Sequence, residues 1–144
     1  IDTDKEIEAA AGMAISDIFA NQGEEAFRRL ETGVLEKLLK QGGRSVISVG
    51  GGLPLRAENR ALLKQLGTVV YLDVLPETVM ERIGSDVSDR PMLHGSDVMG
   101  RIISLLDSRK PRYLEASHMT VDVNGRDVDD IVEEIYRRAA DKTC

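Results

Sequence analysis

The sequence has a single cysteine, Cys144, and it is the last of the 144 residues. An internal disulfide is therefore excluded, which fits a protein of the reducing cytosol. The two histidines, His94 and His118, are far apart in the sequence, and no Cys/His cluster suggests a zinc site. No apolar run approaches the ~18 residues of a membrane-spanning helix, and no signal-peptide pattern opens the sequence. We therefore expect a cytoplasmic protein with no membrane contact.

Positive charge is also scarce, because 19 lysines and arginines face 25 aspartates and glutamates, for a net charge of -6. This balance argues against general binding of nucleic acid or anionic membrane, since both need a positive surface. Basic groups that matter must be local. With 42% hydrophobic and 31% charged residues, the composition is ordinary for a soluble globular protein, and the length predicts a single domain over 1–144.

Three successive glycines, Gly50, Gly51 and Gly52, follow the apolar segment Val46–Val49. The β-branched residues of that segment predict a strand buried on both faces. At the carboxyl end of a parallel strand, backbone without side chains suits the floor of a ligand pocket. A tight strand-to-helix turn packed closely on its neighbours is the alternative, and the glycines alone do not decide between the two.

Strand and helix patterns alternate along the chain, which predicts βα units and a parallel sheet. The segments typical of strands are 46–49, 68–73 and 118–123. The segments typical of helices are 7–18 with a break at Gly12 and an end at Gly23, 24–40, 54–66, a helix opened by Pro76, one begun by Ser96 and Asp97, and 128–135. The expected core stripe of the helix 24–40 is Phe27, Leu30, Val34 and Leu38, and that of the last helix is Val128, Ile131, Val132 and Ile135.

Asp2, Thr3 and Asp4 allow two interpretations. If the segment is extended, both carboxylates point to the same side at a strand end, which is the geometry of a magnesium ligand or a general base. Thr3-Asp4-Lys5-Glu6 also fits a helix-capping box with acidic residues in the first turn, and the sequence favours this cap.

Arg28 lies in a different angular sector of its helix from the core stripe, in line with Leu35 and Leu39, so we expect it to be partly covered. In the alternative, it pairs with Glu24 or Glu31 on a solvated face.

Arg109 continues the apolar stripe of the helix that starts at Asp97, and a guanidinium there calls for a partner. Either a buried acid or a bound anion meets that need, and we favour the anion because Pro111 ends the regular helix beside it.

The segment 84–95 interrupts the alternation and contains Arg90-Pro91-Met92-Leu93. A loop of this length is typical of a mobile lid, and lids commonly carry an arginine that closes over a charged ligand. A solvent-facing charge is the alternative for Arg90.

Taken together, these motifs resemble the shikimate kinases over essentially the whole chain. The resemblance rests on the order and spacing of Asp2-Thr3-Asp4, Gly23-Glu24, Phe27-Arg28, Glu31, Gly50-Gly51-Gly52, Asn59-Arg60, Arg90-Pro91-Met92-Leu93, and Arg109 leading into Pro111 and Tyr113. It implies an α/β fold of three layers around a parallel sheet, like that of the nucleoside-monophosphate kinases, with a P-loop. It also implies transfer of the ATP γ-phosphate to the 3-hydroxyl of shikimate, with shikimate and ATP as ligands, Mg²⁺ as cofactor and a monomeric enzyme.

The resemblance further implies a role for individual residues. Asp2 would hold magnesium through water, and Asp4 would bind substrate hydroxyls and assist removal of the attacking proton. The shikimate-binding residues would be Arg28 and Arg109, which clamp the carboxylate, with Gly50, Gly51 and Gly52, which let backbone approach the ring. The nucleotide-binding residues would be Arg90, which neutralises the transferred phosphoryl group, and Arg82 and Arg126 on the adenine side.

The main departure of the sequence from the family pattern is that no Gly-Lys dipeptide occurs in it, so the P-loop is absent from these residues. Smaller departures are Met92 in the lid and Val128. We expect the chain to be a piece of a longer kinase. The longer kinase would have, before Ile1, a βα unit of about 30 residues that this sequence lacks. Two other functions remain open at this point: a related small-molecule kinase such as a gluconate kinase, and a non-catalytic shikimate-binding homologue without a P-loop.

Overall fold

The computed structural model describes residues 1–83 and 97–141, so the predicted lid 84–95 and its Arg90 lie outside the described residues. The chain divides into two compact units, residues 1–67 and 68–144. The prediction of a single domain over 1–144 stays a prediction.

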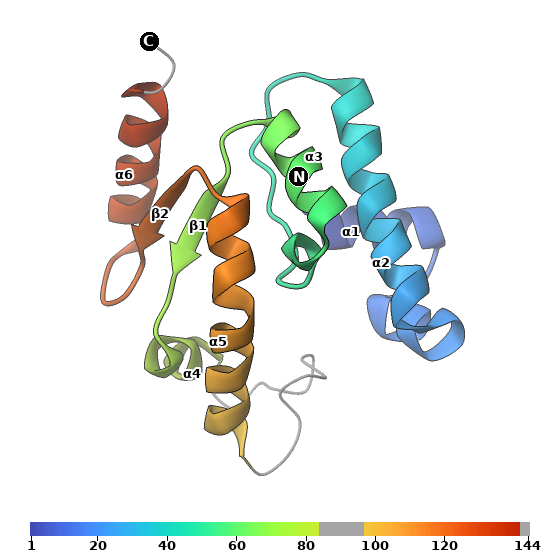
Figure 1. Cartoon of the computed structure of the whole chain (residues 1–144), viewed down its shortest axis with the longest axis horizontal. Helices are drawn as coiled ribbons and strands as arrows, with labels where there is room; N and C mark the ends of the chain where they lie inside the picture. Colours follow the sequence, from blue (N-terminus) through green and yellow to red (C-terminus); the bar gives the residue numbers. More distant parts are fainter. Residues whose placement is uncertain (84–96, 142–144) are drawn as a thin grey trace. The chain divides into compact units, whose positions relative to one another are not determined.

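The first unit is mainly helical (Figure 1). Its elements are α1 (Thr3–Ala11), α2 (Ile15–Gln41), the 3-10 turn η1 (Leu53–Leu55) and α3 (Ala57–Leu66). Gly12 ends α1 at φ 69°, and Gly23 interrupts α2 at φ 83° and ψ 172°. Because side chains disfavour positive φ, glycine is suited to both breaks. The predicted breaks at these two glycines are confirmed.

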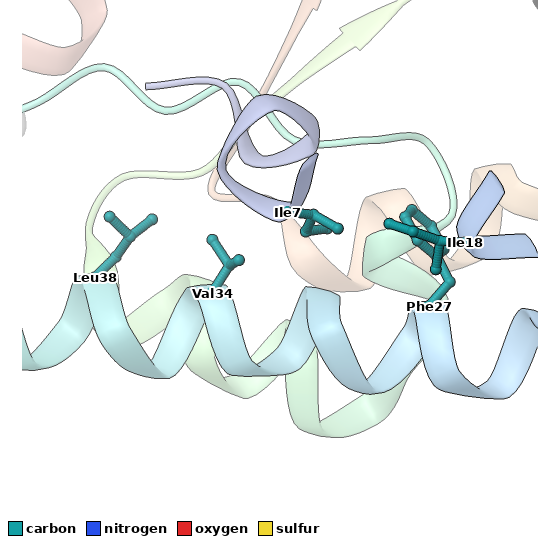
Figure 2. Close-up of a cluster of buried hydrophobic side chains, with 5 residues drawn as sticks. All are labelled: Ile7, Ile18, Phe27, Val34 and Leu38. Atoms are coloured by element: carbon teal, nitrogen blue, oxygen red, sulfur yellow. The ribbon is translucent and has the colours of Figure 1, made fainter. Parts of the chain in front are cut away.

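One hydrophobic cluster of this unit lies between α1 and α2 (Figure 2), and Leu35, Leu53 and Leu63 are buried elsewhere in the unit. The buried members of the cluster are Ile7, Ile18, Phe27, Val34 and Leu38. Three residues of the predicted stripe, Phe27, Val34 and Leu38, are therefore buried as expected, and Leu30 packs against them. Full burial of one such side chain is worth about 1.5 to 3 kcal/mol, so this stripe fixes which face of α2 turns inward and which sector carries Arg28.

Within the part of the chain that the structure describes, the segment Val46–Val49 pairs with the first residues of the chain. Asp2 and Ser48 form a parallel bridge, in which Thr3 N–H donates to the Ser48 carbonyl at 3.0 Å and Ser48 N–H to the Ile1 carbonyl at 2.7 Å. Val46 is 89% exposed. The prediction of a strand buried on both faces is therefore wrong for the described residues, because hydrophobic composition buries a strand only where other layers cover both of its faces.

The predicted helix 54–66 begins later than expected. Pro54 lies inside η1, Arg56 is extended at ψ 133°, and α3 starts at Ala57. Proline at an early position suits a 3-10 turn as well as an α-helix, because its missing N–H would be unpaired in either. Gly67 ends α3 as predicted.

The second unit contains a parallel pair of strands, β1 (Val70–Asp73) and β2 (Met119–Asp122), in the register Val70 to Met119. Its helices are α4 (Pro76–Ile83), α5 (Val98–Ala116) and α6 (Val128–Asp141). Val121, Val123 and Ile131 form its buried cluster, with Val70, Val74 and Ile135 against them. The parallel pairing across an intervening helical stretch confirms the α/β interpretation.

Two predictions about the helices of this unit are wrong. Helix α5 does not end near Lys110 but continues through Pro111 to Ala116. The lost hydrogen bond is offset by packing beyond the proline, where Tyr113 contacts the Tyr71 ring at 5.4 Å between centroids and Ala116 is buried.

In α6, only Ile131 and Ile135 of the expected core stripe face the cluster, whereas Val128 and Val132 are 72% and 57% exposed. The helix packs on its neighbours through one narrow sector.

Candidate functional site

Asp2 stands where the extended N-terminal residues enter α1. Its backbone is extended, and its Oδ1 accepts from Asp4 N–H at 3.0 Å and Lys5 N–H at 3.4 Å. The favoured capping interpretation is confirmed, although Asp2 rather than Thr3 is the capping residue. The alternative, in which Asp2 and Asp4 follow one another along a strand, is wrong because Asp4 lies in the first turn of α1.

Asp4 instead faces the glycine turn. A Cβ built on Gly50 would lie 3.1 Å from Asp4 Oδ1 and 3.6 Å from Glu31 Oε2. Both carboxylates therefore lie against bare backbone at this position, which a side chain at residue 50 would crowd.

Arg28 reaches the same turn from α2. Its Nη1 donates to Glu31 Oε1 at 2.7 Å, and its Nη2 lies 3.4 Å from Glu24 Oε1. The Arg28 side chain is 16% exposed and that of Glu31 only 1%. The expectation that Arg28 is partly covered is confirmed, and both pairings considered for it are formed. The solvated face expected for them is wrong for Glu31, which is buried.

Gly52 lies directly against the Arg28 guanidinium. A Cβ on Gly52 would lie 2.3 Å from Nη1 and 2.5 Å from Nη2. The backbone of Gly52 has φ -88°, which any residue adopts, so a side chain here would be opposed by the space that the guanidinium occupies and not by backbone conformation. The turn is therefore packed closely, but on charged groups, which combines the two interpretations of the glycines.

Burial and repulsion by neighbouring carboxylates raise the pKa of both carboxyl groups, Asp4 and Glu31. Desolvation raises the pKa of Asp4, with further increases from Asp2 and Glu8, and Arg28 opposes them. Desolvation also raises the pKa of Glu31 and outweighs the hydrogen bond and charge of Arg28, which lower it. The site thus holds two carboxyl groups that bind a proton more readily than exposed ones do.

We expect the Glu31→Gln variant to remove a pH dependence of stability. Because the folded-state pKa of Glu31 lies above its ordinary value of 4.5, its contribution to the free energy of unfolding is full below that value. The contribution is lost as the pH rises through the folded pKa. Urea unfolding at several pH values should show the wild type losing stability relative to Glu31→Gln over this window. A difference that stays constant with pH would contradict the assignment.

Two further polar residues hold the glycine turn, and sequence reasoning assigned neither of them a role. Asn59, fully buried on α3, donates from Nδ2 to the Leu53 carbonyl at 2.9 Å, and Thr32 Oγ1 donates to Asn59 Oδ1 at 2.7 Å. The signal available in the sequence was the position of Thr32, one turn after Arg28 on the same helix.

Arg109 belongs to the second unit, where it is half-buried on α5. Within residues 1–83 and 97–141, no acid pairs with its guanidinium, so the buried-acid interpretation has no support there. The bound-anion interpretation stays a prediction.

Arg82 and Arg126 meet at the loop between β2 and α6. Arg82 Nη2 donates to the Val123 carbonyl at 3.0 Å, and Arg126 Nη1 donates to the Asp122 carbonyl and to Glu134, each at 2.8 Å. The structure thus brings together the two residues predicted for the adenine side, and it gives both a part in holding this loop.

The described residues contain no group of three or more His, Cys, Asp or Glu side chains that could hold a metal ion. Mg²⁺ usually takes only one or two protein carboxylates and completes its shell with water and phosphate. Asp2 fits such a water-mediated contact, because only its Oδ1 takes part in capping α1. No helix in the described part of the chain is long and apolar enough to cross a membrane.

Comparisons with known proteins agree on one family. The family model "Shikimate kinase" matches residues 1–140. The shikimate kinase of Symbiobacterium thermophilum is 41% identical over 143 residues, which cover 99% of this chain and 82% of that protein. The shikimate kinase of Neisseria gonorrhoeae is 45% identical over 121 residues, with 84% and 70% covered.

The solved structures give the same result for the fold. Shikimate kinase from Acinetobacter baumannii in complex with shikimate is 36% identical, with a TM-score of 0.87, and the match covers 98% of this chain and 78% of that one. That from Bacteroides thetaiotaomicron is 28% identical, with a TM-score of 0.83, and 100% and 83% are covered. The motifs, the α/β fold with its parallel strand pair, and these matches lead to one conclusion: the chain belongs to the shikimate kinase family.

Proposed function

We propose that this protein transfers the γ-phosphate of ATP to the 3-hydroxyl of shikimate. Family membership makes it an ATP-dependent kinase, a transferase that acts on shikimate. The observation that carries the proposal is the arrangement around the glycine turn, where Arg28, Glu31 and Asp4 meet bare backbone at Gly50 and Gly52. One cation, two carboxyl groups of raised pKa and backbone without side chains suit a small acid that carries several hydroxyls.

Arg28 binds the carboxylate of shikimate in this proposal. A guanidinium presents two parallel N–H donors to a carboxylate, and Glu31 orients that fork from the buried side. Gly50, Gly51 and Gly52 allow the ring to approach the backbone. Arg109 is proposed as a further carboxylate ligand.

Asp4 accepts hydrogen bonds from the substrate hydroxyls and takes up the proton of the attacking 3-hydroxyl. A general base works best when its pKa lies near the working pH. Burial and the neighbouring carboxylates raise the pKa of Asp4 in that direction. Positioning and electrostatics supply the rest of catalysis in phosphoryl transfer.

ATP with Mg²⁺ supplies the phosphoryl group. We propose that Asp2 holds the metal through water, that Arg82 and Arg126 frame the adenine side, and that Arg90 neutralises charge on the transferred group. We further propose that the protein acts in the cytoplasm, as a monomer, and without nucleic-acid or membrane partners, which its net charge of -6 supports.

The test measures ADP release by the full-length product of the gene, with shikimate and with gluconate as acceptors. Shikimate-dependent ADP release, with a product phosphorylated at the 3-hydroxyl, is expected. Activity with gluconate alone would assign a different kinase. Calorimetry showing shikimate binding that is indifferent to ATP, without turnover, would assign a binding protein instead. Either of those results would overturn the proposal.

A further inference from the structure

Asn59 is fully buried, although its side-chain amide carries both a hydrogen-bond donor and an acceptor. Its two partners lie on different elements of the first unit, the Leu53 carbonyl in η1 and the Thr32 hydroxyl on α2. Because the Leu53 carbonyl can only accept, the amide nitrogen must face η1 and the amide oxygen must face Thr32. Asparagine donates to the Leu53 carbonyl and accepts from the Thr32 hydroxyl with one side chain. Aspartate and leucine are similar in size, but an ionised aspartate cannot donate and leucine can neither donate nor accept.

The Leu53 carbonyl is directly joined to the glycine turn. Leu53 N–H donates to the Gly50 carbonyl at 3.2 Å, and Leu55 N–H donates to the Gly52 carbonyl at 3.2 Å. Arg60, the next residue on α3, adds bonds from Nη1 to the carbonyls of Pro54 and Leu55 at 3.0 and 2.9 Å. The N-terminal half of α3 therefore holds all three carbonyls of η1.

Thr32 connects the same asparagine to the helix of Arg28. Its hydroxyl also lies 3.2 Å from the Arg28 carbonyl, one turn earlier on α2, and its shorter contact to Asn59 takes the single hydroxyl proton. A buried polar chain thus runs from the backbone of Arg28 through Thr32 and Asn59 to the turn that carries Gly50 and Gly52.

We infer that Asn59 is a positioning residue, which sets the separation between the Arg28 guanidinium and the backbone of Gly52. The space between the guanidinium and the Gly52 backbone is small, because a Cβ built on Gly52 would lie 2.3 Å from Arg28 Nη1. If the glycine turn shifted away from Arg28, bound shikimate could not contact the guanidinium and the glycine backbone at the same time in the correct geometry. The inference rests on the proposed function, since it concerns the site assigned to shikimate.

The test compares Asn59→Leu, Thr32→Val and the double variant in the full-length product of the gene. Thr32→Val leaves the buried Asn59 Oδ1 without its donor, and Asn59→Leu leaves the Leu53 carbonyl without its donor, so each single variant should lower stability. The double variant removes Asn59 Oδ1 together with the hydroxyl that pairs with it, so its loss of stability should be smaller than the sum of the two single losses. In all three we expect the KM for shikimate to rise about ten-fold, because misplaced binding groups weaken substrate contacts. The KM for ATP should stay within about two-fold of the wild type.

Thr32→Ser is the matched control, because it keeps the hydroxyl and should keep the wild-type KM for shikimate. A merely structural role for Asn59 would lower the amount of folded enzyme and leave both KM values unchanged, most clearly in the double variant. That outcome would overturn the inference. If Asn59→Leu does not fold, the contrast between Thr32→Val and Thr32→Ser decides in the same way. Failure of the proposed function is distinguishable, because the wild type itself would then show no shikimate-dependent turnover, which also removes the inference.

Discussion

Replacing Arg28 with alanine should lower kcat/KM for shikimate about 1000-fold, which corresponds to about 4 kcal/mol. The variant loses the charged fork proposed for the substrate carboxylate, and charge-assisted pairs are the strong ones. It also leaves Glu31, whose side chain is 1% exposed, without its cation. Breaking a buried pair from one side costs about 3 kcal/mol or more of stability. Steady-state kinetics and urea unfolding measure the two effects separately.

A second substitution separates binding from folding. In Arg28→Ala combined with Glu31→Gln, no charge is left buried and unpaired, so stability should largely return while kcat/KM stays low. Glu24→Gln is the control, because Glu24 is 69% exposed and pairs with Arg28 at 3.4 Å, and such pairs contribute less than about 1 kcal/mol. If the double variant regained activity together with stability, Arg28 would be a structural residue and not a substrate ligand.

Gly52→Ala should lower kcat/KM for shikimate about 100-fold, an effect that a misplacement of about 1 Å can produce. The added Cβ would overlap the Arg28 guanidinium, which lies 2.3 to 2.7 Å from its position, so either the guanidinium or the turn must move. The backbone at φ -88° accepts alanine without strain. The loss should therefore appear in the KM for shikimate more than in the unfolding midpoint.

Gly33→Ala provides the matched control on α2. Gly33 is a helical, exposed glycine, and a Cβ there meets nothing within 4 Å. Alanine should stabilise the helix by about 1 kcal/mol or less and leave the kinetics unchanged, because it restricts the unfolded chain without touching the site. Equal kinetic losses in the two glycine variants would contradict the steric explanation for Gly52.

Much of the first unit could be predicted from local patterns. The breaks at Gly12 and Gly23, the inward stripe of Phe27, Val34 and Leu38, and the partial cover over Arg28 all follow from helical periodicity and backbone conformation. These features depend on neighbours within a few turns. The cap at Asp2 was also within reach, with an error of one residue in its position.

Predictions failed where the outcome depended on residues far away in the sequence. Val46 is exposed although the composition of its segment predicts a buried strand. That prediction failed because composition does not tell which layers cover a strand. Helix α5 continues past Pro111, because packing beyond the proline outweighs a local signal. Val128 is exposed on α6 for the same kind of reason.

The sequence by itself determined the family, the alternation of helix and strand, and the residue types of the site, because periodicity and motif order are properties of the chain. Only the tertiary structure decided how those types act together. It buried Glu31 beneath Arg28, brought the Asp4 carboxylate to Gly50, and joined α2 to the glycine turn through Thr32 and Asn59. These contacts link α1, α2, η1 and α3, and the burial that shifts the pKa of Asp4 and Glu31 exists only once those elements have packed.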